Sequence, residues 1–341
     1  MPELRTDALT GLRSIVAAER SGRPGGEPSV EPRPPVDPET DPFAEGHEDR
    51  TPPELFALRP GGGEPNTPGW RVRVVPNLYP ALAPPAAPGD GSPAATPPDP
   101  VAAGRGEPRF FGSQPAAGAH EVIVNAPQPV SSLRELDPDQ VQVAMEVWRE
   151  RMRTHAGAPC LHAIVNEGAA AGASLPHTHA QLYALPFVPS AVARERERFT
   201  AYAQRTDGRN LLEDLVQDEV RRGERIVAVD REAVALCPFA SRSPYQVQIV
   251  PRRPRRRFED DGPLGAALLH DVLGRLESVL GAVPPYNLWV RTAPSGAERF
   301  CWRIDLVPRL TRLAGLEMGT GVNLNVVAPE HAAERLREAG R

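Results

Sequence analysis

Lysine is absent from this 341-residue sequence, so its 39 basic side chains are all arginine. Because the whole chain shares this bias, residue type alone does not mark any single arginine as functional. Acidic residues outnumber basic ones, and the formal net charge of −5 gives no indication of nucleic-acid binding. The densest basic run, residues 251–257, follows an apolar segment and is broken by prolines. We interpret it as a solvated loop rather than a site for phosphate-rich partners.

Cysteine and long apolar segments are also scarce. The three cysteines, Cys160, Cys237 and Cys301, lie far apart and form no CxxC pair. This spacing argues against a disulfide framework and favours a reducing, cytoplasmic location. No segment approaches the roughly 18 consecutive apolar residues that span a bilayer, and the N-terminus has no apolar signal region. We therefore expect a soluble, non-secreted protein with no membrane partner.

Proline and glycine are abundant but unevenly distributed. Residues 81–118 are dominated by proline, alanine and glycine, and such a composition offers almost nothing to bury. We expect a disordered insertion there and an irregular arm over the second proline-rich stretch, residues 23–38. Neither segment is expected to carry chemistry.

The remaining sequence alternates between strand and helix patterns. A helix is expected from Pro138, with Asp137 as its N-cap. Its apolar positions recur at helical spacing and predict a buried face: Val141, Met145, Trp148 and Met152. A second helix has the same pattern: Leu268, Leu269, Val272, Leu276 and Leu280. Strands are expected over residues 70–75, 121–124, 161–165, 179–185, 226–229, 233–236, 245–250, 286–290 and 302–307.

Both halves of the chain follow one order of strand, turn, strand, helix, strand, polar loop and strand. This repetition indicates an internal duplication. The predicted fold is α+β, with two related lobes, each an antiparallel sheet with packed helices, over residues 1–186 and 187–341. Cys301, Arg303 and Asp305 occupy in the second copy the place of His177, His179 and Gln181 in the first.

The segment VNEGAAAGASLPHTHAQLYALP, residues 165–186, concentrates the candidate chemistry. His177, His179 and Gln181 alternate along a predicted strand and therefore project to one face. The small side chains of residues 166–174 would leave backbone N–H groups free to approach an anion. A neutral imidazole is a competent nucleophile toward phosphorus, and Gln181 can donate a hydrogen bond to a phosphoryl oxygen. A histidine on a strand is usually structural, and an HxH on a strand can also be half of a zinc site.

The same segment resembles the active-site segment of the galactose-1-phosphate uridylyltransferase family, a branch of the histidine-triad superfamily. The family pattern N-x-G-x-x-x-G-x-S-x-x-H-x-H-x-Q is matched in full by Asn166, Gly168, Gly172, Ser174, His177, His179 and Gln181. Further segments follow in the family's order along most of the chain, including residues 4–24, 41–54, 70–82, 118–127 and 306–337. The resemblance implies two histidine-triad-like lobes and a homodimer.

The resemblance also implies a double-displacement nucleotidyl transfer. His179 would attack the α-phosphorus of a nucleoside diphosphate sugar, and a sugar 1-phosphate or phosphate would then accept the nucleotide. Gln181 would bind the phosphoryl group in both steps, and His177 would brace the strand or a metal. Further residues are implied to contact the nucleotide, its phosphates or the sugar: Arg20, Arg23, Asn77, Asn166, Gly172, Ser174, Glu317 and Asn323. The resemblance favours UDP-glucose–hexose-1-phosphate uridylyltransferase activity and leaves open an ADP-glucose phosphorylase activity.

The chain departs from the family at its metal sites. Many members bind zinc through a CPxC pair and two histidines, whereas this chain has Asp41 and Ala44 at the cysteine positions. Asp41, His120 and His177, helped by His47, leave a weaker structural zinc site open. A second metal site of some members uses histidines where this chain has Arg291, Cys301 and Arg303, and no metal is expected there.

Two other classes of protein remain open at this stage. A non-catalytic nucleotide-sugar-binding protein could use the same pocket, although it would not need both His179 and Gln181. A zinc-dependent scaffold would require stoichiometric metal. Residues 316–321, with sequence LEMGTG, could form part of a sugar pocket or only a turn at the sheet edge.

Overall fold

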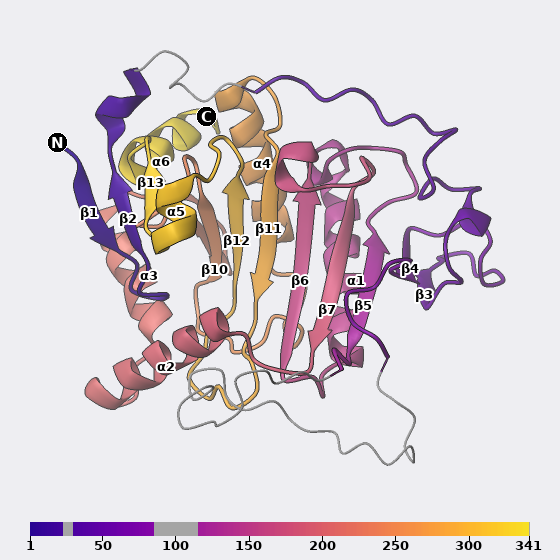
Figure 1. Cartoon of the computed structure of the whole chain (residues 1–341), viewed down its shortest axis with the longest axis horizontal. Helices are drawn as coiled ribbons and strands as arrows, with labels where there is room; N and C mark the ends of the chain where they lie inside the picture. Colours follow the sequence, from indigo (N-terminus) through magenta and orange to yellow (C-terminus); the bar gives the residue numbers. More distant parts are fainter. Residues whose placement is uncertain (23–29, 85–114, 341) are drawn as a thin grey trace.

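The computed structural model describes residues 1–22, 30–84 and 115–340. Its main element is a ten-stranded sheet in the order β3-β4-β5-β7-β6-β11-β12-β10-β9-β8, with all neighbouring strands antiparallel (Figure 1). These strands are β3 (Phe56–Leu58), β4 (Val72–Pro76), β5 (Ala119–Val124), β6 (Cys160–Glu167), β7 (His179–Leu185), β8 (Ile226–Val229), β9 (Ala233–Leu236), β10 (Val247–Pro251), β11 (Tyr286–Arg291) and β12 (Arg303–Pro308). The predicted α+β class with antiparallel sheets is confirmed.

A smaller three-stranded sheet and the helices complete the described fold. The small sheet contains β1 (Glu3–Thr6), β2 (Arg13–Val16) and β13 (Asn323–Asn325). The α-helices are α1 (Pro138–Thr154), α2 (Ser190–Arg205), α3 (Leu211–Arg222), α4 (Ala266–Leu280), α5 (Gly315–Thr320) and α6 (Pro329–Glu338). Short 3-10 helices are η1 (Ala18–Gly22), η2 (Glu48–Arg50), η3 (Leu133–Glu135) and η4 (Ala169–Ala171). No helix within the described ranges combines the length and apolar character needed to cross a membrane.

The two halves of the chain meet in the middle of the large sheet, where β6 pairs with β11. The first half contributes β5, α1, β6 and β7, and the second contributes β10, α4, β11 and β12 in the same order. The register places Asp305 of β12 at the position that Gln181 holds in β7. The division of the chain near residue 186 stays a prediction, because one continuous sheet includes strands from both halves.

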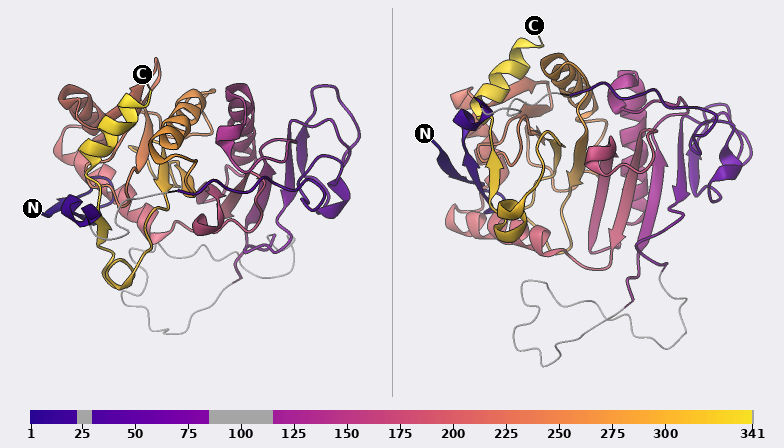
Figure 2. Two further views of the ribbon diagram at one scale, coloured as in Figure 1. Left: turned by 90° about the horizontal axis from the view of Figure 1, so that it is seen from above. Right: turned by 45° about the horizontal axis from the view of Figure 1, so that its top comes forward.

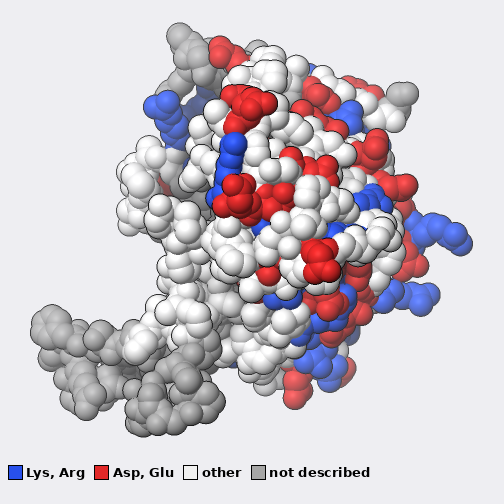
Figure 3. Space-filling model, turned by 90° about the vertical axis from the view of Figure 1, so that its right-hand side faces the viewer, with Lys and Arg blue, Asp and Glu red and all other residues white. Residues whose placement is uncertain are grey.

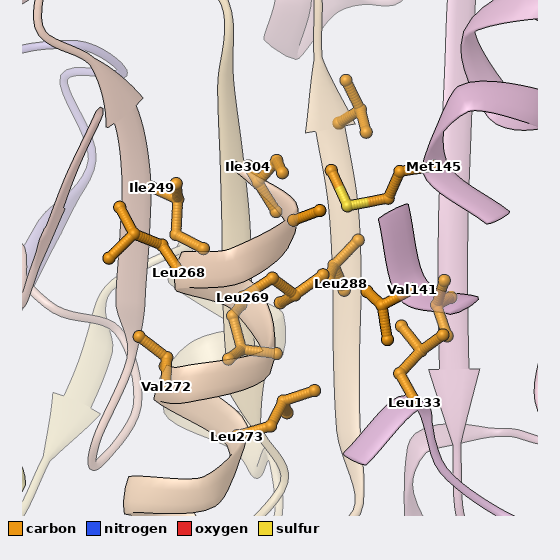
Figure 4. Packing of buried hydrophobic residues seen from close by; sticks show 14 of the residues in the cluster. Leu133, Val141, Met145, Ile249, Leu268, Leu269, Val272, Leu273, Leu288 and Ile304 are labelled. Atoms are coloured by element: carbon orange, nitrogen blue, oxygen red, sulfur yellow. The ribbon is translucent and has the colours of Figure 1, made fainter. Parts of the chain in front are cut away.

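One face of the sheet is covered by helices and forms the main core. Figure 2 shows α1, α4 and α6 side by side along this face. The predicted apolar stripe of α1 is buried, with Val141, Met145 and Met152 each 0% exposed. Leu269 of α4 lies beside Leu288 of β11 in the same cluster (Figure 4). Burial of these side chains stabilises the sheet at about 25 cal/mol per Å² of apolar surface removed from water.

The opposite face of the sheet is polar over its central strands. Alternate residues of β7 send Ala180 and Leu182 into the core, so His179 and Gln181 project to the other side. Toward the β8 edge this second face is closed by α2 and α3, where Phe199 packs with other buried residues. The arrangement leaves the motif on the face without α1 and α4.

The N-terminal segment forms two strands. β1 and β2 are an antiparallel pair joined by a turn in which Gly11 has φ +72°, and β2 also pairs in parallel with β13. The pairing with β13 connects residues about 300 positions apart, so local sequence could not reveal it. Residues 315–320 form the short helix α5 rather than a turn, with Gly321 in the left-handed conformation after it.

Most of the expected insertion over residues 81–118 lies outside the described residues, as do Arg23 and its neighbours through residue 29. The described ends of the insertion are paired. Ala83 forms a parallel bridge with Ala117, and the Gly118 N–H donates to the Ala83 carbonyl at 2.7 Å. The predicted disorder is therefore wrong for residues 81–84 and 115–118, where these backbone bonds close the loop at its base.

Charged side chains are mixed on the side of the molecule that faces the viewer in Figure 3. There, among the residues that the structure describes, Arg side chains lie interspersed with Asp and Glu rather than in one basic patch.

Candidate active site

His179 and Gln181 lie on β7 between β5 and β6, near the middle of the first half of the sheet. His179 pairs with Val124, and Gln181 lies between Val122 and Ile164. The His179 side chain is largely shielded from solvent, with 7% of the residue exposed. As predicted, both side chains are on the same face of the sheet.

The tautomer of His179 follows from one hydrogen bond. Its Nδ1 lies 2.7 Å from the backbone carbonyl oxygen of His177. A carbonyl oxygen only accepts, so Nδ1 carries the proton and donates it. Burial lowers the pKa of His179, which keeps the ring neutral near pH 7. Nε2 of His179 therefore carries a lone pair and can act as a nucleophile.

His177 is held at both ring nitrogens. Nδ1 lies 2.6 Å from Oδ2 of Asp41, and Nε2 donates to the carbonyl oxygen of Ala126 at 2.9 Å. The side chains of Asp41 and His177 are both buried. Asp41 Oδ1 also accepts the Phe43 N–H at 2.9 Å, and the Phe43 ring lies edge-on to His179 with 5.2 Å between centroids. The loop containing Asp41 therefore holds His177 in place, and His177 in turn orients His179.

The residue between the two histidines is anchored on the core side of the strand. Thr178 donates to Oε1 of buried Glu167 at 2.8 Å and accepts from Asn125 Nδ2 at 3.1 Å. Burial raises the pKa of Glu167. Sequence reasoning did not identify this network, although a threonine at a core-facing position between two histidines was the available signal.

Gln181 has partners that the motif does not contain. Its Oε1 lies 3.0 Å from Nε2 of His120 and 3.0 Å from the Tyr183 hydroxyl. The rings of His120 and Tyr183 stack with 4.1 Å between centroids. Asn77 lies beside them, with Nδ2 3.2 Å from His120 Nε2. The structure thus brings predicted residues Asn77, His120 and Gln181 together and adds Tyr183.

The three expected zinc ligands do not form one site. His120 of β5 pairs with Tyr183 of β7. His177 lies before the start of β7, at the other end of the β5–β7 pair. Both ring nitrogens of His177 are already hydrogen-bonded, and His47 Nδ1 contacts the backbone carbonyl of Asp41 at 2.7 Å rather than extending a ligand set. Within the described ranges, no group of three or more His, Cys, Asp or Glu side chains is arranged to hold a metal ion. The ligand set Asp41, His120 and His177 does not fit zinc here.

The loop before the histidines is supported by the second half of the sheet. Asn287 of β11 donates to Asn166 Oδ1 and to the Ala171 carbonyl, each at 2.8 Å. Gly172 has φ +85°, a backbone conformation that favours glycine. Ser174 is exposed. Asn287 is a supporting residue that the motif pattern did not include.

The expectation that this loop keeps its backbone N–H groups free is wrong for three residues. The N–H groups of Ala171 and Ala173 both donate to the Gly168 carbonyl, and that of Gly172 donates to the Ala169 carbonyl. These bonds form η4, whose compact turn uses the donors internally. The N–H groups of these three residues are therefore not available to an anion.

The predicted sugar-binding and phosphate-binding residues of the chain ends lie elsewhere. Arg20 and Glu317 line a cavity of about 390 Å³ together with Leu316 and Leu324. Asn323 belongs to β13 of the small sheet. Figure 1 shows β2, β13 and α5 on the opposite side of the molecule from β5 and β7. Within one chain, these residues are therefore not brought to His179.

The second half carries an ion-pair network where the first half carries the histidines. Glu195 of α2 accepts from Arg303 at 3.1 Å and lies 3.3 Å from Nε of Arg291. Arg303 Nε lies 2.9 Å from Oδ2 of Asp305, and Oδ1 of Asp305 accepts from Gln248 Nε2. Burial opposes the charge of Arg303, but Asp305 and Glu195 together raise its pKa. Arg291 and Arg303, at positions where some family members have metal-binding histidines, thus belong to a buried cluster whose charges are compensated by Glu195 and Asp305.

Comparison with known proteins places this geometry in a family. Residues 63–189 match the family model of the galactose-1-phosphate uridyl transferase N-terminal domain. Residues 135–339 match a model described as a domain of unknown function, DUF4921. The chain is 29% identical to ADP-glucose phosphorylase from Arabidopsis thaliana, over 99% of this chain and 93% of the relative. It is 30% identical to galactose-1-phosphate uridylyltransferase from Haemophilus influenzae, over 68% of this chain and 70% of the relative.

Solved structures agree with the sequence relatives. A crystal structure of the Arabidopsis thaliana ADP-glucose phosphorylase with bound ADP-glucose superposes with a TM-score of 0.78 at 26% identity, over 99% of each chain. A uridylyltransferase structure shares the fold with a TM-score of 0.70. The named relatives are enzymes of the nucleotidyltransferase kind. The chain belongs to the galactose-1-phosphate uridylyltransferase family and, through residues 135–339, to the family described as DUF4921.

Proposed function

We propose that this protein transfers a nucleotidyl group from a nucleoside diphosphate sugar by double displacement through His179. The observation that carries the proposal is the bond from His179 Nδ1 to the His177 carbonyl, which leaves Nε2 unprotonated. In the first step Nε2 forms a bond to the α-phosphorus, and the bond from that phosphorus to the bridging oxygen breaks. The sugar 1-phosphate leaves with the electron pair.

The second step is the same reaction in reverse, with a different phosphate group as the acceptor of the nucleotide. An oxygen of the acceptor attacks the α-phosphorus, the P–N bond breaks, and the electron pair returns to Nε2. The His177 carbonyl supports both steps, because it accepts from Nδ1 while the ring carries positive charge in the intermediate. Gln181 donates to a phosphoryl oxygen without adding a second base. No step of this proposal requires a metal ion.

Two donors fit the family. UDP-glucose with a hexose 1-phosphate such as galactose 1-phosphate as acceptor is supported by the uridylyltransferase relatives. ADP-glucose with phosphate as acceptor is supported by a relative that matches almost the full length of this chain and whose structure holds ADP-glucose. Asn77, Asn166, Gly172 and Ser174 are proposed to contact the nucleotide and its phosphates.

We further propose a homodimer that completes the site. Glu317 lies in α5 and Asn323 in β13, on the opposite side of the molecule from β7 (Figure 1), and Arg20 lines the same cavity as Glu317, so a second copy would have to supply them. The surface beside Glu317 is apolar, with Leu316 and Met318 exposed by 42% and 74%. Apolar side chains of this kind are typical of a covered interface. Arg23 is proposed to act with Arg20 on the phosphates.

The proposed location is the cytoplasm. Cys160, Cys237 and Cys301 are buried free thiols, and burial raises the pKa of Cys160 to about 11. Thiols of this kind are compatible with a reducing compartment.

Intact mass spectrometry tests the catalytic proposal. The purified wild type is incubated separately with UDP-glucose and with ADP-glucose. His179→Ala is the test variant, and His331→Ala, a change at an exposed histidine, is the control. A UMP-sized or AMP-sized adduct on the wild type and on His331→Ala, but not on His179→Ala, supports the covalent histidine and identifies the base. Binding of either donor without any adduct would instead support a non-catalytic nucleotide-sugar-binding protein.

A further inference from the structure

We propose that His120 and Tyr183 are positioning residues that orient the amide of Gln181, so that its NH₂ group is presented to the transferring phosphoryl group. The inference rests on the proposed nucleotidyl transfer, and it gives His120 a role other than metal binding. It rests on three hydrogen bonds: from the Ala81 N–H to His120, from His120 to Gln181, and from Tyr183 to Gln181.

The first contact sets the tautomer of His120. The backbone N–H of Ala81 lies 3.1 Å from Nδ1 of His120. A backbone N–H can only donate, so Nδ1 must be the unprotonated acceptor. A neutral His120 then carries its proton on Nε2. Burial lowers the pKa of His120, although the bond to Gln181 opposes this shift, and the ring is neutral at pH 7.

The second contact sets the direction of the Gln181 amide. Because Nε2 of His120 is a donor, the atom of Gln181 that lies 3.0 Å away must be the acceptor, Oε1. Asn77 Nδ2 lies 3.2 Å from the same Nε2, but Asn77 Oδ1 accepts the Tyr79 N–H at 2.8 Å, which fixes Nδ2 as the facing atom. Two donors cannot bond to each other, so His120 Nε2 donates to Gln181.

The third contact supports the same orientation of the Gln181 amide. The Tyr183 hydroxyl lies 3.0 Å from the same Oε1 and must donate to it, since Oε1 has no proton. Tyr183 pairs with His120 across β5 and β7, and their rings stack at an interplanar angle of 23°. The cross-strand pair thus holds both donors beside one oxygen of Gln181.

The consequence for transfer is electrostatic. With Oε1 occupied by two donors, both N–H bonds of Gln181 are on the other end of the amide and can donate to phosphoryl oxygens. The reversed amide would present its own oxygen to a negatively charged phosphoryl group and would repel it. Groups that are oriented before the reaction stabilise developing charge without reorganising.

A double-mutant cycle tests whether Tyr183 acts through Gln181. Single-turnover rates of adduct formation are measured by rapid quench and intact mass for wild type, Tyr183→Phe, Gln181→Ala and the double variant. Tyr183→Phe keeps the stacked ring, and we expect it to slow the step about two- to tenfold with little change in KM for the donor. In the Gln181→Ala background the same substitution should lower the rate of adduct formation by less than about twofold. Equal losses in both backgrounds would overturn the proposal.

The matched control is Tyr202→Phe. Tyr202 donates its hydroxyl to Asp214 in the α2–α3 region, away from β7. Removal of that hydroxyl should leave the adduct-forming rate unchanged, and an effect as large as that of Tyr183→Phe would mean that the cycle reports only general destabilisation.

A second measurement does not depend on activity. In protein labelled with ¹⁵N-histidine, the ring nitrogen shifts of His120, assigned with a His120→Asn variant, should show an unprotonated Nδ1 and a protonated Nε2. The opposite tautomer overturns the proposal even if the protein transfers nucleotides. If the tautomer is as expected but no nucleoside diphosphate sugar reacts, the proposed function fails, and the role of the amide in transfer fails with it.

Discussion

Nδ1 of His177 lies 2.6 Å from Oδ2 of Asp41, and both side chains are almost completely shielded from solvent. His177 in turn offers its carbonyl oxygen to His179. Asp41 therefore acts on the candidate nucleophile through one intervening residue.

Substitution of Asp41 should weaken both the fold and the reaction. Asp41→Asn removes the negative charge beside His177, and we expect a loss of about 1.5–3 kcal/mol in the free energy of unfolding. Adduct formation should slow because the His177 carbonyl is held less firmly. Urea denaturation and the intact-mass assay measure the two effects. Asp49→Asn, an exposed change in the nearby 3-10 helix η2, is the control, and equal behaviour of the two variants would contradict the expectation.

The stability of the protein should fall in mild acid. Burial lowers the pKa values of His179 and His120 and lowers that of His162 to about 3, whereas an unfolded histidine has a pKa near 6.5. Below pH 6.5 the unfolded chain binds more protons than the folded one, so stability declines as pH falls. For His162 the loss between pH 6.5 and pH 5 is about 1–2 kcal/mol.

Urea denaturation of the wild type and His162→Gln at pH 7 and pH 5 checks this linkage. The difference in stability between the two pH values should be smaller in the variant. An unchanged difference would show that His162 is not neutral in the fold.

Substitution of Glu195 in the buried ion-pair cluster of the second half should lower the stability of the protein. Glu195→Gln leaves Arg303 and Arg291 with less compensation, and breaking a buried ion pair costs about 3–5 kcal/mol. Glu197→Gln changes an exposed residue on the same helix and should have little effect. Chemical denaturation of both variants separates the two cases, and matching midpoints would mean that Glu195 contributes no net stabilisation.

Mixing of inactive variants should restore activity if the site is shared between two copies. His179→Ala and Glu317→Ala each remove one part of the proposed site. After exchange of subunits, the mixed dimer contains one site without either substitution, so about a quarter of wild-type activity is expected. Sedimentation analysis confirms the oligomeric state. A dimer whose mixed samples stay inactive would contradict the shared site, because it would mean that Glu317 of one copy does not act with His179 of the other.

The motif and the core helices were predictable because their information is local. His179 and Gln181 share a face since they alternate on a strand, and Met145 and Leu269 are buried since they lie on apolar helix faces. The family resemblance rests on the same local pattern and is confirmed by the relatives.

The three-dimensional arrangement of the chain decided which groups orient these side chains. Asp41 reaches His177 across 136 residues, and Glu195 reaches Arg303 across 108. Such contacts depend on strand register and loop closure, which residue type and spacing do not encode locally. The same reason explains why Asp41, His120 and His177 do not form the predicted zinc site: pairing of β5 with β7 places the ring of His120 against Gln181 and Tyr183.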